Sequence, residues 1–250
     1  MDKQKILSQL YNEEMIFNEK NLYETSKRID ASITHKEIKK FLKNQKAQQV
    51  FHNKPEEKEY KPITSDNFYS FQIDLTFLQK YSSSNDGNYV LFTAINIISR
   101  YAYAFYAKNK KASTILKLFK EFHGMTEIVD ITCDEGSEFK NKNFIKYCKN
   151  EQINIFFVKG DGHKLGIINR FHRTLKENLS KYFVTKKTVK WINVIDKIID
   201  VYNNTVNEGI KCTPEEAHED PITMNSIMYE KKTKKKNIRR KHLRLVNTVE

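Results

Sequence analysis

The middle of the chain alternates between apolar runs and short polar breaks in the manner of a β-sheet. Three runs rich in aromatic and β-branched residues follow one another, over residues 68–78, 88–98 and 100–108. The turn-like stretch SSSNDGN and a short break at Ser99 separate them. The pattern therefore predicts three consecutive strands, connected as a meander.

The pattern then changes to an alternation of helices and strands. Residues 110–122 repeat apolar side chains at helical spacing, which predicts an amphipathic helix packed on the sheet. Next come an apolar run at 127–133, a helical pattern at 143–151 and a second apolar run at 153–158. Strand, helix and strand at this spacing imply that the two strands pair in parallel.

Three helices are predicted after the last strand. A long one spans residues 165–183, and a second spans 189–202, with Trp191 on it expected in the core. The third begins at Thr213, which is placed to cap it, with proline at the first helical position and glutamate at the third.

The two ends of the chain differ from the middle. Residues 1–63 are helical in pattern but very polar, with apolar positions too sparse for a self-sufficient core. The clearest helix there follows Thr34, which forms a capping-box pattern with Glu37. The prolines and charges of residues 54–64 indicate a linker. Residues 223–250 form a basic tail, in which nine Lys and Arg fall within 14 positions.

Composition and charge narrow the function classes. The chain has 250 residues, 44 Lys and Arg against 31 Asp and Glu, and a net charge of +13, which favours a polyanionic partner. Its apolar runs are shorter than the roughly 20 residues of a membrane span, and its charged start is not a secretory signal. Three cysteines without a CxxC pair fit a reducing compartment. We expect an intracellular protein without membrane segments, in a nucleus, a viral factory or a virion.

Two carboxylates stand out as candidate chemistry. Asp74 lies in the middle of the first strand, where alternation places it on the opposite face from Ile73 and Leu75. Asp134 ends the fourth strand, just before a turn. Either aspartate alone is more typical of an edge or a turn, but carboxylates at neighbouring points of a sheet commonly hold a divalent cation.

Several motifs in order carry a resemblance to a known family. They are Asp74 in a strand, SRYA, CDEGSEF at the end of the fourth strand, GIINRFHRTLKENL on the long helix, and YNNT followed by TPEEA. They resemble the retroviral-type integrase core, and more narrowly the integrases of Maverick/Polinton-like elements and related viral transposons. The resemblance covers about residues 68–218. It implies an RNase H-like α/β fold for residues 64–222, with a mixed five-stranded sheet flanked by helices.

The resemblance also implies a DDE strand-transferase site, in which three acids hold two metal ions. Its first two acids match Asp74 and Asp134, which would bind Mg²⁺ or Mn²⁺. The third is a glutamate in the motif ERFHRTLK, and this chain has Asn169 there. Asparagine is neutral and offers one oxygen, so the second metal should bind poorly. Asp161 and His163, in the loop before the helix, are alternative ligands.

The long helix offers basic residues for DNA. Asn169, His172, Arg173 and Lys176 fall at helical offsets of 3, 4 and 7, which predicts one exposed face that starts at the metal site. We expect Arg173 and Lys176, with the neighbouring Arg170, to contact the DNA backbone, although a solvated basic face is the common alternative. The basic tail could hold phosphates, act as a nuclear import signal or remain unstructured.

Three functions are compatible with these features. The first is an integrase-like DNA-binding protein of a mobile element or large DNA virus that acts in DNA integration by metal-dependent strand transfer. The second is a catalytically inactive relative that serves as a DNA-binding or assembly subunit. An RNase H-like nuclease is disfavoured by the RFHRTLK and YNNT motifs. The resemblance implies a homo-oligomer or an active paralogue as partner, and the lack of cysteine before Cys133 predicts no zinc.

Overall fold

A computed structural model describes residues 2–45, 63–159, 164–224 and 226. Most of the predicted linker, nearly all of the basic tail, and the alternative ligands Asp161 and His163 lie outside these residues. Within the described residues, no helix is both long enough and apolar enough to cross a membrane.

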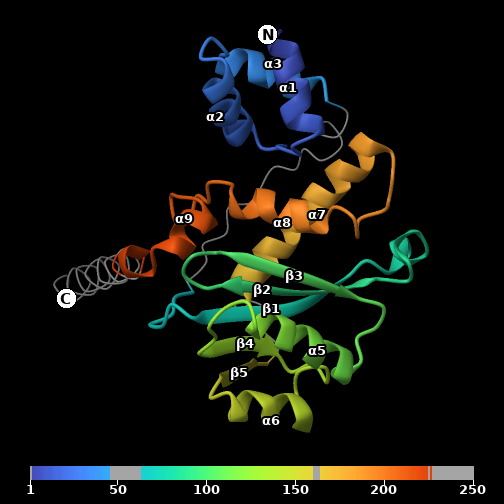
Figure 1. Cartoon of the computed structure of the whole chain (residues 1–250), viewed down its shortest axis with the longest axis vertical. Helices are drawn as coiled ribbons and strands as arrows, with labels where there is room; N and C mark the ends of the chain where they lie inside the picture. Colours follow the sequence, from blue (N-terminus) through green and yellow to red (C-terminus); the bar gives the residue numbers. More distant parts are fainter. Residues whose placement is uncertain (1, 46–62, 160–163, 225, 227–250) are drawn as a thin grey trace, which may run out of the picture.

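Five strands form one mixed sheet in the order β3-β2-β1-β4-β5 (Figure 1). The first three strands pair antiparallel, as the predicted meander requires, while β4 pairs in parallel with both β1 and β5. This confirms the predicted α/β class and five-stranded mixed sheet. The strands are β1 (Ser70–Phe77), β2 (Val90–Asn96), β3 (Ala102–Ala107), β4 (Asp130–Asp134) and β5 (Asn154–Val158).

Helices cover both faces of the sheet (Figure 1). Strand β2 is buried on both sides, and its residues alternate between two hydrophobic clusters. Phe92 points to the cluster shared with α5 and α6, whereas Leu91 points to the cluster shared with α7 and α8. The four helices are α5 (Ala112–His123), α6 (Lys142–Asn150), α7 (Gly166–Lys186) and α8 (Ile195–Asn203).

Helix α8 begins later than the sequence predicts. Helix α8 starts at Ile195 rather than near residue 189, because the buried Asn85 side chain fixes the preceding segment in another conformation. Asn85 Oδ1 accepts the Trp191 N–H at 2.6 Å, and Asn85 Nδ2 donates to the Val189 oxygen at 2.9 Å. Trp191 is fully buried, as predicted, but it precedes the helix.

Short capped helices lie at the two ends of the described chain. Helix α9 (Pro214–Glu219) begins with the predicted capping box at Thr213. At the other end, α1 (Lys3–Asn12), α2 (Glu19–Ile29) and α3 (His35–Lys43) form a three-helix unit, and the predicted box between Thr34 and Glu37 is present at the start of α3.

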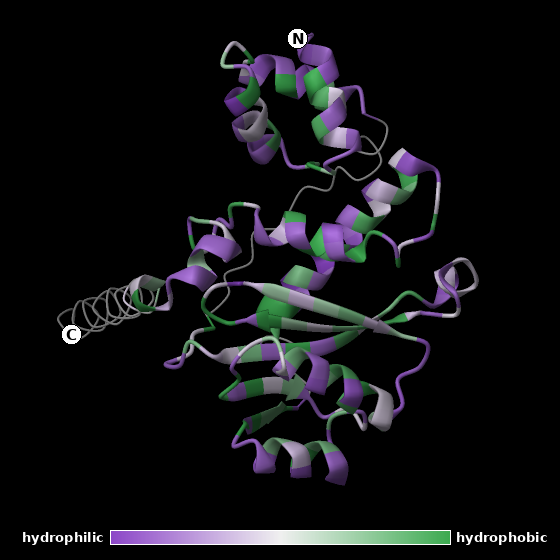
Figure 2. Cartoon of the chain, viewed as in Figure 1, coloured by the Kyte–Doolittle hydropathy of each residue, from purple (hydrophilic) through white to green (hydrophobic). Residues whose placement is uncertain are grey.

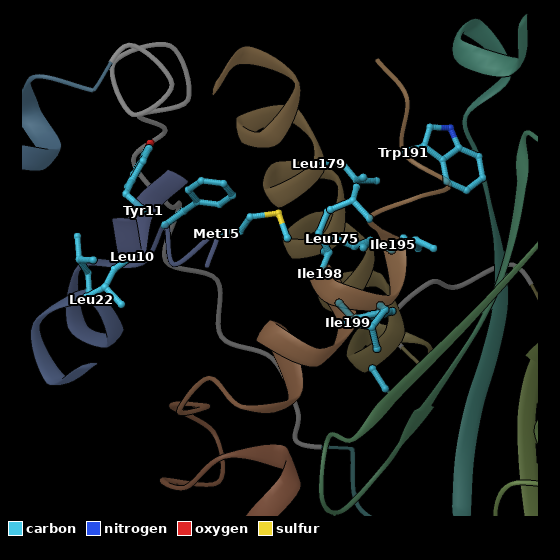
Figure 3. Close-up of a cluster of buried hydrophobic side chains, with 14 of the residues drawn as sticks. Leu10, Tyr11, Met15, Leu22, Leu175, Leu179, Trp191, Ile195, Ile198 and Ile199 are labelled. Carbon is cyan, nitrogen blue, oxygen red and sulfur yellow. The ribbon is translucent and has the colours of Figure 1, made fainter. Parts of the chain in front are cut away.

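The three-helix unit shares its core with the rest of the protein. Figure 2 shows hydrophilic and hydrophobic residues interspersed along its helices. Leu10, Tyr11 and Leu22 belong to the same buried cluster as Leu175 and Leu179 of α7. In Figure 3, Met15 extends from the loop between α1 and α2 toward α7 and α8. The sparse apolar residues of this unit thus pack on the long helix that continues to the candidate site.

Candidate active site

Asp74 lies in β1 on the face of the sheet that α7 covers. Its neighbours Ile73 and Leu75 point to the opposite face and pack in the cluster with α5, as the alternation predicted. The Leu75 N–H donates to Asp74 Oδ1 at 2.7 Å. Burial raises the pKa of the Asp74 carboxyl to about 6; the Leu75 hydrogen bond opposes this rise, and the charges of Asp134 and Glu138 add to it. The carboxylate therefore needs a compensating positive charge.

His172 is buried beside Asp74, which differs from the exposed position predicted for it. The Thr93 hydroxyl donates to the Asp74 main-chain oxygen at 3.0 Å, and His172 Nε2 lies 2.7 Å from that hydroxyl. The Thr93 hydroxyl and His172 Nε2 are therefore hydrogen-bond partners. On the other side of the ring, His172 Nδ1 lies 3.6 Å from Asp74 Oδ2.

The contact between His172 and Asp74 is not an ion pair at neutral pH. Burial, with a smaller contribution from the nearby charge of Lys176, lowers the pKa of His172 to about 4. The neutral ring shares a hydrogen bond with the Thr93 hydroxyl through Nε2 and has Nδ1 on the side of the Asp74 carboxylate. The helical period alone did not reveal this burial, because the position lies at the border between the two faces of α7.

Asp134 ends β4, the strand next to β1. Strands β1 and β4 pair with Gln72 opposite Thr132, an offset of 60 residues that also separates Asp74 from Asp134. The Gly136 N–H donates to Asp134 Oδ1 at 3.1 Å. The two aspartates are thus level with each other at neighbouring points of the sheet.

Glu138 brings a third carboxylate near this pair, and sequence reasoning missed it. A Cβ atom at Gly136 would lie 2.8 Å from Glu138 Cδ and 3.0 Å from Asp134 Oδ1, so the glycine makes room for both side chains. The charge of Glu138 also contributes to the raised pKa of Asp74. The signal in the sequence is the spacing of Glu138 four residues after Asp134, in a turn that contains a glycine.

Gln72 fixes the start of α7 against the sheet, and it too was missed. This fully buried side chain lies two residues before Asp74 in β1. Its Nε2 donates to the Lys164 oxygen at 2.8 Å, and its Oε1 accepts the Ile168 N–H at 3.0 Å. Asn169 is the next residue of the helix and is exposed. The first turn of α7 is therefore tied directly to the strand that carries Asp74.

The donor atoms at this site fit one divalent cation better than two. Asp74 and Asp134 supply two carboxylates, and Mg²⁺ commonly binds one or two carboxylates together with water and phosphate oxygens. In the described part of the chain, no three His, Cys, Asp or Glu side chains are grouped so that they could hold a metal ion. The neutral Asn169 leaves the three-carboxylate arrangement implied by the resemblance incomplete.

The predicted DNA contacts lie on the exposed face of α7. Arg170, Arg173 and Lys176 are all exposed, and the charge of Lys176 lowers the pKa of Asp74. Arg100, in the SRYA motif, has a left-handed φ of 65°, and its Nη1 donates to the Ile97 main-chain oxygen. Burial, opposed by Tyr202 and helped by the charge of Arg170, lowers the pKa of Arg100 to about 10. Two arginines close enough to repel each other favour an anion such as a phosphate.

Comparisons with known proteins identify a similar fold and two relatives in sequence. The fold is similar to the catalytic core domain of BIV integrase, with a TM-score of 0.51 and 17% identity over 62% of this chain and 96% of that one. The sequence is 33% identical over 141 residues to an uncharacterized transposon-derived protein of Caenorhabditis elegans. It is 31% identical over 127 residues to the retrovirus-related Pol polyprotein from transposon 412 of Drosophila melanogaster.

The extent of these matches limits what they establish. The two sequence matches cover 55% and 49% of this chain. The chain spans only 48% of the nematode protein and 10% of the polyprotein. No protein-family profile matches the chain. The similarity to BIV integrase confirms the predicted RNase H-like fold. The chain therefore has the fold of a retroviral integrase catalytic core and is related in sequence to proteins of transposon origin.

Proposed function

We propose that this protein binds DNA and acts in the DNA integration of a mobile element, by metal-dependent strand transfer. The observation that carries the proposal is the placement of Asp74 and Asp134 at neighbouring points of β1 and β4, beside the exposed basic face of α7. An acidic pair next to basic side chains suits a phosphodiester, because it combines a cation site with contacts for the DNA backbone.

Each group has a role in this reaction. Asp74 and Asp134 would hold Mg²⁺ or Mn²⁺, which activates the attacking hydroxyl and stabilises charge on the phosphate. Arg170, Arg173 and Lys176 would bind the backbone and orient the scissile phosphate. In strand transfer, the oxygen of a DNA 3′-hydroxyl forms a bond to phosphorus while the bond from phosphorus to the leaving 3′-oxygen breaks. The leaving oxygen takes up a proton and becomes a new 3′-hydroxyl.

The replacement of the third acid by Asn169 favours a second candidate function. Without that carboxylate the chain would be a catalytically inactive DNA-binding or assembly subunit, acting beside an active paralogue. Its DNA affinity would then depend on salt but not on a divalent metal. In either function two DNA ends must be held together, so we expect a homo-oligomer or a complex with the paralogue, in a nucleus or a viral factory.

A strand-transfer assay separates the two functions. Oligonucleotides from the ends of the element are incubated with Mn²⁺ and with the wild type, Asp74→Asn or Asn169→Glu. Products from the wild type that disappear with Asp74→Asn would support strand transfer. Products from Asn169→Glu alone would overturn strand transfer by this protein and support the inactive subunit. DNA binding is measured for all three proteins, so that loss of product is not mistaken for loss of binding.

A further inference from the structure

Helices α2 and α3 follow each other across a short turn, which is the order of elements in a helix-turn-helix. A turn of five residues, 30–34, connects them. Ile33 in this turn is buried, and Thr34 caps α3 through its hydrogen bond with the Glu37 N–H. The rings of Tyr23 on α2 and His35 on α3 stack with centroids 3.6 Å apart and planes 20° apart. These contacts hold α3 in a fixed orientation on α2.

One face of α3 packs inward and the other carries lysines. Ile38, Phe41 and Leu42 are buried in the core of the three-helix unit. The remaining face is exposed and has four lysines: Lys36, Lys39, Lys40 and Lys43. The lysines cover a nine-residue helix that is long enough to lie in the major groove of DNA.

Charge is separated within the three-helix unit. Residues 27–43 contain six basic and two acidic side chains, a net charge of +4, whereas residues 2–24 contain three basic and five acidic ones, a net charge of −2. Within the acidic part, Glu13 and Glu14 face the rest of the protein. There, Lys197 of α8 donates to the Glu13 oxygen at 2.7 Å and lies 3.2 Å from the Glu14 carboxylate.

The packing of the three-helix unit on the rest of the protein leaves α3 exposed. The contacts of this unit with the rest of the protein come from α1, from the loop between α1 and α2, and from the start of α2, where Asn21 donates to the Thr205 hydroxyl at 2.7 Å. Figure 1 shows α3 at the end of the unit that is remote from α7 and α8. Lys36, Lys40 and Lys43 lie on the exposed face of α3, and the Lys39 ammonium lies 3.8 Å from the Glu19 carboxylate of α2.

We propose that α2 and α3 form a DNA-binding helix-turn-helix, with α3 in the major groove of duplex DNA. In such motifs the second helix enters the groove, while the first crosses the backbone. Lysines along α3 would contact the phosphates on both sides of the groove. This site is separate from the acidic pair and from the basic face of α7, so it would bind DNA whether or not strand transfer occurs.

The test compares two matched pairs of lysines in the full-length protein. Lys36→Gln/Lys40→Gln removes two charges four residues apart on α3. The control, Lys142→Gln/Lys146→Gln, removes two exposed charges with the same spacing on α6, which also has nine residues. Fluorescence anisotropy with a labelled 20-bp duplex gives the affinity between 50 and 200 mM NaCl, and circular dichroism verifies that each variant is folded.

The expected result is a specific loss with the α3 variant. Removing two phosphate contacts lowers the slope of log K against log salt by about 1.8 and weakens binding at 0.1 M salt by roughly tenfold or more. The control variant changes total charge equally and should bind as the wild type does. Equal effects of the two variants would overturn the proposal, as would wild-type binding by the α3 variant. Arg173→Gln/Lys176→Gln, measured in parallel, tests the separate proposal about α7.

Discussion

Asp74 should destabilise the protein at neutral pH when no metal is bound. Its side chain is only 22% exposed, and burial raises its pKa from 3.8 to about 6. Each pKa unit corresponds to about 1.36 kcal/mol, so the charged form costs on the order of 2–3 kcal/mol. Asp74→Asn removes the charge but keeps an oxygen that can accept the Leu75 N–H. We therefore expect the variant to be more stable by about 2–3 kcal/mol at pH 7.5.

The pH dependence of this gain has a definite sign. The folded protein binds a proton at Asp74 more tightly than the unfolded chain does, so this group makes stability fall as pH rises from about 4 to above 6. The variant lacks this fall. The difference in unfolding free energy between Asp74→Asn and wild type should be small near pH 4 and reach its full size above about pH 6.5.

Urea denaturation with EDTA at several pH values measures the difference, and Glu127→Gln controls for the loss of one exposed negative charge. The control should shift stability by less than about 0.5 kcal/mol. A gain that is absent at pH 7.5, or equal at pH 4.5 and 7.5, would refute the electrostatic reasoning. Repeating the measurement in 10 mM MgCl₂ should narrow the gap, because the cation compensates the Asp74 charge in the wild type alone.

Two further predictions concern buried polar groups. Thr93→Val should cost about 1–3 kcal/mol in urea denaturation, because it leaves the buried His172 Nε2 without its hydrogen-bond partner. Thr76→Val should cost nothing, since the buried Thr76 hydroxyl has no hydrogen-bond partner among the described residues. Glu177→Gln should lower the free energy of unfolding by about 1–2 kcal/mol at pH 7, because it removes the carboxylate that lies 2.7 Å from the buried Lys181 ammonium. This loss should disappear when Lys181→Met is combined with Glu177→Gln. An equal cost in the two threonine variants, or a cost that persists in the Met background, would contradict these assignments.

The fold could be predicted because its signals are local and repeated. Alternating apolar runs marked all five strands, and strand-helix-strand order predicted the parallel pair of β4 and β5. The start of α8 could not be predicted, because it depends on hydrogen bonds between Asn85 and Trp191, more than 100 residues apart. Helix caps at Thr34 and Thr213 were predictable, since capping joins residues that are three positions apart.

The candidate site could be predicted only in part. Asp74 and Asp134 stood out as charges inside or at the end of apolar strands, and the register brings them level. His172, Gln72 and Glu138 were not recognised as parts of the site, because their importance comes from contacts between separate elements. The roles of Asp74, Asp134 and Asn169 in metal binding and catalysis remain predictions that the strand-transfer assay tests.

The shared packing between the three-helix unit and α7 has a practical consequence for protein production. Leu175, Leu179 and Ile198 are buried in one cluster with residues of α1 and α2, and Figure 3 shows Met15 reaching toward them. A shortened protein that begins at the sheet would expose this apolar strip to water and favour aggregation. Proteins expressed for crystallisation should therefore retain the first 45 residues, even when only the sheet and its covering helices are of interest.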